Sequence, residues 1–220
     1  MRALLTAVLI LAVAMPAAAQ HAGHGSSDSH HAGGVFPDGW QGRLDRDSEQ
    51  LTNVRFMTMG DAFHIITGPH VILWNPAQTA SAQFRASGTF RQTRAPERLE
   101  GFGLVVGGRD LDAPGQDYLY FLVRHDGRFM IRHRAGTEVH TLVNWTEHAA
   151  INRAGEATAA SNALSIEARA GAVRFLVNGT VVQTFERVPM LNTDGVVGLR
   201  IGHHVDVHVE DLSVEPISGL

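Results

Sequence analysis

Two dipeptides constrain the fold of this chain more than any other feature, because each stands between two stretches of apolar strand-forming residues. Asp126-Gly127 lies within FLVRHDGRFMI, and Asn178-Gly179 lies within VRFLVNGTVVQTF. Both dipeptides suit the type I′ turn, whose two central residues take positive φ, so each stretch is predicted to form a two-residue β-hairpin. The chain is therefore predicted to contain antiparallel strands.

Strand patterns continue through almost all of the chain after Phe36, whereas helix patterns are scarce. The expected strands are rich in Val, Ile, Phe, Thr and Tyr and are separated by Gly, Asp, Asn or Pro. They cover residues 54–59, 62–67, 70–74, 80–93, 101–106, 118–125, 128–134, 138–143, 163–169, 173–178, 180–186, 195–201 and 205–214. Residues 152–160 lack an apolar stripe and are expected to form a loop. So many short strands predict an all-β fold, a jelly-roll sandwich of two antiparallel sheets.

The two hairpins also predict which residues share a face of their sheet. A two-residue turn at Asn178-Gly179 makes Phe175 oppose Val182 and Val173 oppose Thr184. The same rule, applied to Asp126-Gly127, gives two faces. One is expected to hold Tyr118, Tyr120, Leu122, Phe129, Ile131 and His133, and the other Leu119, Phe121, Val123, Met130, Arg132 and Arg134.

The first residues of the chain have the pattern of a secretory signal peptide. Arg2 precedes an apolar run over residues 3–15, and Pro16 and three alanines follow, so residues 1–19 are predicted to be removed before Gln20. The run is shorter than the roughly 20 residues of a membrane-spanning helix. We therefore expect a periplasmic or secreted protein, in which residues 20–36 form a His/Gly/Ser-rich disordered tether and residues 37–220 a β-jelly-roll domain.

Composition excludes several classes of protein. The chain carries 18 basic and 22 acidic residues, and no basic run stands out, which argues against nucleic acid as a partner. It has no cysteine, so neither disulfides nor a lipid-modified cysteine are expected. Signatures of serine hydrolases, phosphate-binding loops and metal-binding helices are also missing from the sequence.

The tether is a candidate metal-binding segment. Its histidines, at positions 21, 24, 30 and 31, offer neutral imidazoles, which bind Zn²⁺, Cu²⁺ and Ni²⁺ (His21, His24, His30 and His31). A segment of low complexity also lacks the fixed geometry of a metal site. The alternative is therefore a solvated spacer that binds metal only incidentally.

Several stretches together resemble a known superfamily. They are GFGLVVGGRDLDAPGQDYLYFLVRHDGRFMIRHRAG, TLVNWTEHAAI, NALSIEARAGAVRFLVNGTVVQTF and GVVGLRIGHHVDVHVEDLSV. The order of strands and turns resembles the concanavalin A-like lectin/glucanase superfamily, and within it bacterial exported domains of the 3-keto-disaccharide hydrolase type, whose function is unknown. The resemblance spans roughly residues 74–214 and implies a jelly roll whose concave sheet meets carbohydrate.

Glucanases of that superfamily carry Glu-x-Asp-x-(x)-Glu on one strand, which this chain lacks. The nearest stretch is Asp206-Val-His208-Val-Glu210. Alternation places His204, Asp206, His208 and Glu210 on one face of a strand, with neighbours about 6–7 Å apart. Two or three of them would reach one divalent ion or act as acid and base. The alternative is the polar solvent face of an ordinary half-buried strand.

The loop GGRDLDAPGQD is a candidate Ca²⁺ site. Asp110, Asp112 and Asp117 supply carboxylate oxygens, which Ca²⁺ prefers as ligands. The alternative is that Asp and Gly are present here because they favour turns.

Aromatic and basic residues are the candidate sugar contacts. An exposed indole stacks on the C–H face of a sugar, and Trp145, in a loop-like stretch, is expected to be more exposed than Trp74. Tyr120, Arg132 and His133 would add hydrogen bonds to hydroxyl groups.

Three functions remain open from the sequence. The first is a non-catalytic or accessory carbohydrate-recognition domain, and the second is an enzyme that cleaves 3-keto-glycosides with His204, Asp206 and His208. The third is a periplasmic metal-binding protein that uses the tether.

Overall fold

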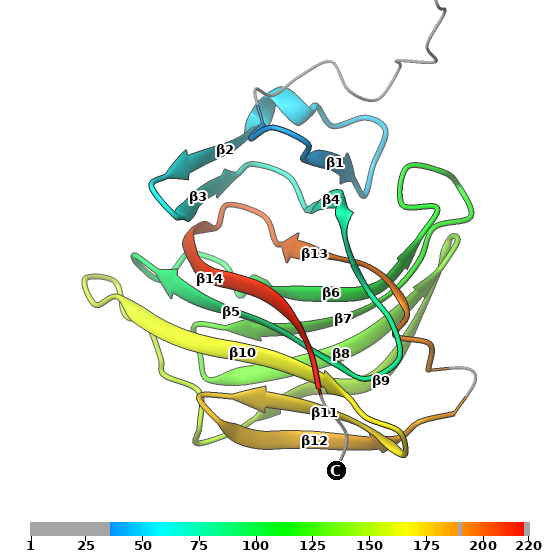
Figure 1. Cartoon of the computed structure of the whole chain (residues 1–220). Helices are drawn as coiled ribbons and strands as arrows, with labels where there is room; N and C mark the ends of the chain where they lie inside the picture. Colours follow the sequence, from blue (N-terminus) through cyan, green and yellow to red (C-terminus); the bar gives the residue numbers. More distant parts are fainter. Residues whose placement is uncertain (1–35, 189–190, 218–220) are drawn as a thin grey trace, which may run out of the picture.

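The computed structural model describes residues 36–188 and 191–217, which form a two-layer β-sandwich (Figure 1). This part of the chain contains fourteen strands and one short 3₁₀-helix, Leu51–Asn53. The strands form two antiparallel sheets of seven strands each. The predicted all-β class and the two-sheet arrangement are therefore confirmed.

Sheet A has the strand order β1-β4-β13-β6-β7-β8-β9. Its strands are β1 (Gln41–Leu44), β4 (Val71–Ala80), β13 (Gly195–Ile201), β6 (Gly101–Arg109), β7 (Asp117–Arg124), β8 (Arg128–Ala135) and β9 (Glu138–Glu147). Sheet B has the order β12-β11-β10-β5-β14-β3-β2. Its strands are β12 (Thr180–Glu186), β11 (Ala172–Val177), β10 (Ala160–Ala168), β5 (Phe84–Gln92), β14 (Asp206–Pro216), β3 (Ala62–Thr67) and β2 (Val54–Met59).

The core lies between the two sheets and is built from the inward side chains of alternating positions. Sheet A contributes Leu104 and Phe121, and sheet B contributes Phe90 and Phe175, all fully buried. The rings of Phe121 and Phe175 meet across the layers at 5.4 Å with a 69° angle, the edge-to-face arrangement that aromatic pairs favour. These contacts join the two sheets.

The hairpin at Asn178-Gly179 has the predicted turn, with φ values of 50° and 78°. Leu176 opposes Val181, as expected from a two-residue turn. A bulge between Phe175 and Leu176 then shifts the register by one residue. Phe175 therefore opposes Gln183 instead of Val182, so the predicted pairing beyond the turn is wrong.

The hairpin at Asp126-Gly127 differs from the prediction in its turn length. Arg124 pairs with Arg128, so the turn has three residues, and of the dipeptide only Gly127 takes positive φ, 82°. The extra residue shifts the register of β8 by one, so each β8 side chain lies on the opposite face of the sheet from the predicted one. The predicted face assignment is therefore wrong: Arg132 opposes Tyr120 and Arg134 opposes Tyr118, while Phe129 and Ile131 join the core.

Most other strands agree with the expected ranges within a few residues. The sequence patterns did not indicate β1, which is only four residues long. They also ended one strand at Trp74, whereas β4 continues to Ala80 through an irregular register. Residues 152–159 form a loop, as predicted.

The predicted signal peptide (1–19) and all but the last residue of the predicted tether (20–36) lie outside the described residues. Within residues 36–188 and 191–217, no helix has the length and apolar character needed to cross a membrane.

Candidate functional site

The outer face of sheet A carries a second apolar cluster, together with several arginines. We call it the arginine–aromatic face. Its apolar members are Ile72, Trp74, Val105, Leu111, Tyr118, Tyr120, Leu122, Met130 and Trp145, and its arginines are Arg124, Arg132, Arg134 and Arg200. Outer faces of antiparallel sheets are ordinarily polar, so a face of this composition requires an explanation.

The Trp145 ring closely approaches β6 because that strand has a glycine, Gly101, at this position. A Cβ atom at Gly101 would come within 2.6 Å of the Trp145 ring. The Arg124 guanidinium lies 4.5 Å from the ring centroid, a cation–π contact, and is itself paired with Asp126. Trp145 is partly exposed, as the sequence predicted for this residue.

Arg200 is a buried cation at the base of the face. It donates to Asp45 at 3.0 Å and to the Tyr118 hydroxyl at 3.1 Å, and it lies 5.0 Å from the Tyr120 ring centroid. Burial alone would raise the pKa of Asp45, but His70 and Arg200 outweigh burial and hold this pKa well below its usual range. Burial opposes the charge of Arg200 as well, yet Tyr118 and Asp45 raise its pKa.

The four predicted sugar contacts separate into two groups. Arg132 and Trp145 lie on the arginine–aromatic face and are partly exposed. Tyr120 shares that face but is only 3% exposed, so it supports Arg200 and offers no free ring surface. His133 points to the other side of sheet A, where it contacts Asp117 at 3.2 Å.

Within the described part of the chain, Arg132 and Arg134 lack the carboxylate partners that Arg85, Arg109 and Arg200 have. Neither has a carboxylate oxygen within 4.0 Å among residues 36–188 and 191–217, although both are partly buried. Arg134 donates to the Gly136 carbonyl at 2.6 Å, while the buried Nε of Arg132 has no protein partner in the same part of the chain. The face therefore presents two cations whose charge no described side chain neutralises.

The last strand shows the predicted alternation. Val205, Val207 and Val209 are fully buried, whereas Asp206 and His208 point outward from sheet B. The sequence did not indicate their cross-strand neighbour His64, which pairs with His208 and lies 2.8 Å from Asp206. The His64 and His208 rings stack at 4.2 Å. Burial, followed by the proximity of His64, lowers the pKa of His208.

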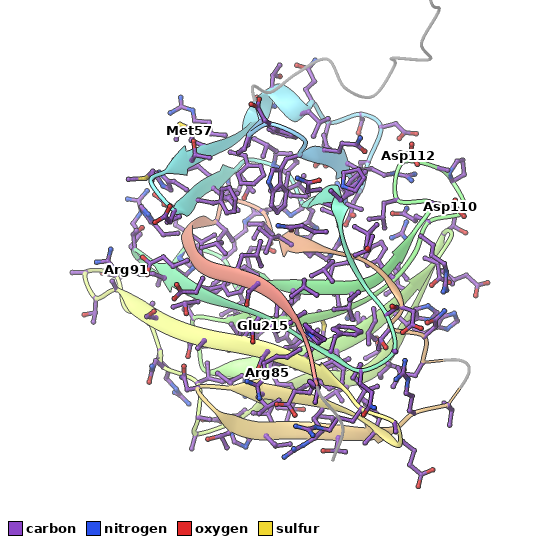
Figure 2. All side chains as sticks on the ribbon, in the orientation of Figure 1. Met57, Arg85, Arg91, Asp110, Asp112 and Glu215 are labelled. Atoms are coloured by element: carbon purple, nitrogen blue, oxygen red, sulfur yellow. The ribbon has the colours of Figure 1, made fainter. Side chains whose placement is uncertain are left out.

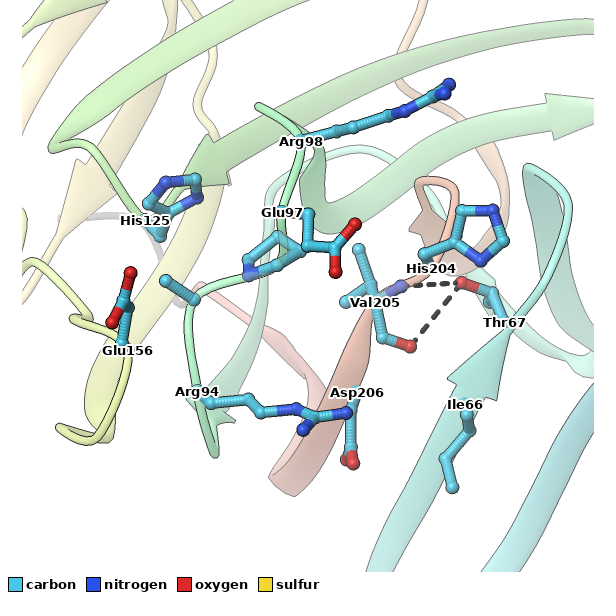
Figure 3. Close-up of a pocket in the computed structure, with 12 residues that line it drawn as sticks. Ile66, Thr67, Arg94, Glu97, Arg98, His125, Glu156, His204, Val205 and Asp206 are labelled. Atoms are coloured by element: carbon cyan, nitrogen blue, oxygen red, sulfur yellow. Dashed lines mark hydrogen bonds between the residues drawn. The ribbon is translucent and has the colours of Figure 1, made fainter.

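His204 and Glu210 do not join this group. His204 lies in the turn before β14 with a φ of 53°, and Glu210 is exposed farther along the strand. An open pocket of about 880 Å³ is lined by residues of both the turn and the strand. In Figure 3, His204 and Asp206 lie on one side of this pocket, and His125 and Glu156 lie on the other. Thr67 accepts a hydrogen bond from the Val205 amide at 3.0 Å and orders this edge of the pocket.

The outward-facing residues of β14 therefore lie on a different sheet from the predicted sugar contacts. Asp206 and His208 belong to the outer face of sheet B, whereas Arg132 and Trp145 belong to the outer face of sheet A. One ligand cannot contact both sets, because the core separates them. The arginine–aromatic face and the β14 residues are two distinct candidate sites.

Comparison with solved structures gives many neighbours of the same architecture. A carbohydrate-binding module, CBM66 from Bacillus subtilis, is 10% identical, with a TM-score of 0.58 over 83% of this chain and 98% of that one. A protein of unknown function with a galectin-like fold, also from Bacillus subtilis, is 12% identical, with a TM-score of 0.57 over 80% of this chain and 89% of that one. Alginate lyase A1-II′ is 10% identical, with a TM-score of 0.52 over 81% of this chain and 94% of that one. The fold is a concanavalin-like jelly roll.

No protein-family model matches the chain, and no curated protein sequence matches it either. At such low identities the neighbours show the jelly-roll fold and nothing finer.

The predicted Ca²⁺ ligands of the jelly roll do not converge. Asp110 and Asp112 are exposed on the loop at the end of β6 (Figure 2), while Asp117 pairs with Arg109 at 2.7 Å and with His133. Residues 36–188 and 191–217 contain two groups of three side chains that could hold a metal ion, and neither includes these aspartates. Calcium binding by this loop stays a prediction. The tether histidines, His21, His24, His30 and His31, lie outside the described residues.

Proposed function

We propose that this protein is a carbohydrate-binding jelly roll that recognises sugars bearing carboxylate or sulfate groups through its arginine–aromatic face. The observation that carries the proposal is the pair Arg132 and Arg134, which share the arginine–aromatic face with Trp145 and have no carboxylate partners among the described residues. Arginine binds carboxylates and sulfates through paired, charge-assisted hydrogen bonds. The fold, shared with a carbohydrate-binding module and with alginate lyase, supports the proposal.

A partly buried arginine gains most from such a ligand. Charge in a partly desolvated position is costly unless it is paired, so an anionic group that approaches Arg132 would provide the partner that its Nε lacks. Trp145 would supply the apolar surface on which a sugar ring packs. The buried Tyr118 and Tyr120 then act as the rigid floor that positions the arginines.

The exported location expected from the signal peptide agrees with this proposal, since acidic polysaccharides are met outside the cell. We propose binding over catalysis because the β14 residues of the glycoside-cleaving alternative lie in the other sheet. Activity on 3-keto-glycosides, which the sequence resemblance suggests, would require the His64–Asp206–His208 group to act without the arginine–aromatic face.

The double variant Arg132→Gln/Arg134→Gln tests the proposal. We expect its affinity for a polyuronate such as alginate to fall about 100-fold, because each charge-assisted contact contributes about 1.5–3 kcal/mol. Trp145→Ala is expected to weaken binding about tenfold through lost stacking. Calorimetric titration with alginate, heparin and a neutral β-glucan, at two salt concentrations, measures these effects.

The matched control is Arg55→Gln/Arg91→Gln, which removes two exposed arginines from sheet B and leaves the same net charge. Its affinity should stay within about twofold of the parent protein. An equal loss of affinity for alginate in both double variants would show nonspecific charge attraction and refute the proposed binding face. Equal affinity for the neutral glucan would refute the preference for acidic sugars.

A further inference from the structure

A cluster of ionisable side chains lies at one end of sheet A, where the chain leaves β13. The cluster forms because three neighbouring strands, β4, β13 and β6, begin or end there: Val71, Ile201 and Phe102 lie side by side. His70 precedes Val71, His203 follows Ile201 after one glycine, and Glu100 precedes β6. Residues far apart in sequence thus meet at one point.

The two histidines and Glu100 are close enough to share one ion. His70 Nε2 lies 2.9 Å from Glu100 Oε2, and His203 Nδ1 lies 3.6 Å from Glu100 Oε1. The imidazole rings are 3.8 Å apart, and one ligand atom from each of the three residues lies within 4.8 Å of the others. Ligand atoms around tetrahedral Zn²⁺ are about 3.3 Å apart, so small side-chain movements complete the geometry.

Glu49 contacts the other nitrogen of His203. Its Oε1 lies 3.5 Å from His203 Nε2, and its Oε2 is buried without a hydrogen-bond partner among the described residues. A buried carboxylate oxygen ordinarily has a partner, so Glu49 adds uncompensated negative charge beside the two histidines. Glu49 and His203 also line an open pocket of about 750 Å³, through which an ion would enter.

Charge favours a cation at the same place. Asp45, Glu49 and Glu100 are three carboxylates, and among the arginines that the structure describes only Arg200 pairs with any of them, through Asp45. With neutral histidines the cluster therefore has an excess of negative charge in a partly buried position, which a divalent ion neutralises.

Asp45 completes the arrangement by its contact with the far side of His70. Its Oδ2 lies 3.5 Å from Nδ1, whereas Nε2 faces Glu100. A carboxylate that holds one imidazole nitrogen as its N–H donor leaves the other nitrogen free for a metal and fixes the ring plane. The side chains also need Gly202, since a Cβ atom there would lie 2.7 Å from Glu100 Oε2.

We propose that His70, Glu100 and His203 bind a divalent transition-metal ion such as Zn²⁺ and leave its fourth position open, while Glu49 holds the other nitrogen of His203. Imidazole nitrogens and carboxylate oxygens are the donor set that Zn²⁺ accepts. The site lies within the folded jelly roll, so it uses none of the tether histidines. The other cluster, His64–Asp206–His208, is the weaker candidate, because it has one carboxylate and His208 stands opposite Arg91.

Zn²⁺ titration of the full-length mature chain tests the site after the histidines of the tether have been replaced. The parent for all variants carries alanine at His21, His24, His30 and His31. Calorimetry should give one tight Zn²⁺ per chain in this parent, and Zn²⁺ should raise its Tm. In His70→Ala/His203→Ala the Kd should rise at least 100-fold, with the Tm increase lost. The matched double variant His64→Ala/His208→Ala should keep the parent's Kd within about threefold.

Glu100→Gln and Glu49→Gln keep the shape of the cluster and provide the test if the double-alanine variant does not fold. Each should raise the Kd for Zn²⁺ about tenfold or more, because the first removes a charged ligand and the second removes the carboxylate that holds the ring of His203. The proposal is overturned if the parent binds no stoichiometric Zn²⁺. It is equally overturned if the cluster variants bind as tightly as the parent, or if His64→Ala/His208→Ala alone abolishes binding.

Discussion

Phe121→Ala is expected to lower the free energy of unfolding by about 4 kcal/mol, the largest stability effect of any substitution we consider. Phe121 is fully buried and contacts Phe129 within sheet A and Phe175 in sheet B. Truncation leaves a cavity between the two layers that the surrounding strands cannot fill, because each is held in its register by neighbours on both sides. Chemical denaturation measures the loss, which corresponds to a Tm lower by about 10 °C.

Leu99→Ala is the matched control for this prediction. Leu99 is 56% exposed, so the same kind of truncation there should change the unfolding free energy by less than about 0.5 kcal/mol. A loss below about 1 kcal/mol for Phe121→Ala would show that the two sheets do not depend on this aromatic contact.

Asp45→Asn is expected to destabilise the protein by about 3 kcal/mol. Removing one partner of a buried ion pair leaves the other charge uncompensated, and Arg200 is almost completely buried. The side chain of Asp45 is 25% exposed, so water partly replaces it and the effect lies at the lower end of the range for buried pairs. Denaturation with a chelator present separates this effect from metal binding. The exposed pair Glu147–Arg153 provides the control, since Glu147→Gln should cost less than about 0.5 kcal/mol.

The same pair makes stability dependent on pH. The pKa of Asp45 is lower in the folded state than in the unfolded chain, where it is about 4. The contribution of the ionised carboxylate is therefore complete above about pH 5 and is lost as the pH falls below 4 toward the folded-state pKa. The difference between the parent protein and Asp45→Asn should be constant from pH 5 to 6 and shrink between pH 4 and 3. A difference that grows as the pH falls below 5 would contradict this assignment.

Features that depend on local pattern could be predicted from the sequence. The burial of Val205, Val207 and Val209 follows from period-two alternation, and the turn at Asn178-Gly179 follows from the backbone preference of its two residues. The all-β fold follows from the repetition of such signals along the chain. These predictions need no knowledge of distant residues.

Features that depend on neighbours in space could not be predicted in this way. His64 contacts Asp206 across 142 positions, and His70 meets His203 only because β4 and β13 are adjacent in sheet A. The bulge beside Phe175 also lacks a signal in the alternation pattern, since it adds one residue to an otherwise regular strand. Pairing of distant strands, which sequence patterns do not specify, builds both candidate metal clusters.

The length of the turn at residues 125–127 determines which β8 side chains lie on the outer face of sheet A. Deleting one residue there would rotate β8 by half a repeat relative to β7, turning Arg132 and Arg134 inward and Phe129 and Ile131 toward water. Natural relatives that keep the cationic surface are thus expected to vary at residues 125 and 126 but to keep a glycine at position 127 and the parity of the turn length. Loop grafting or insertion at this position would have to proceed in steps of two residues.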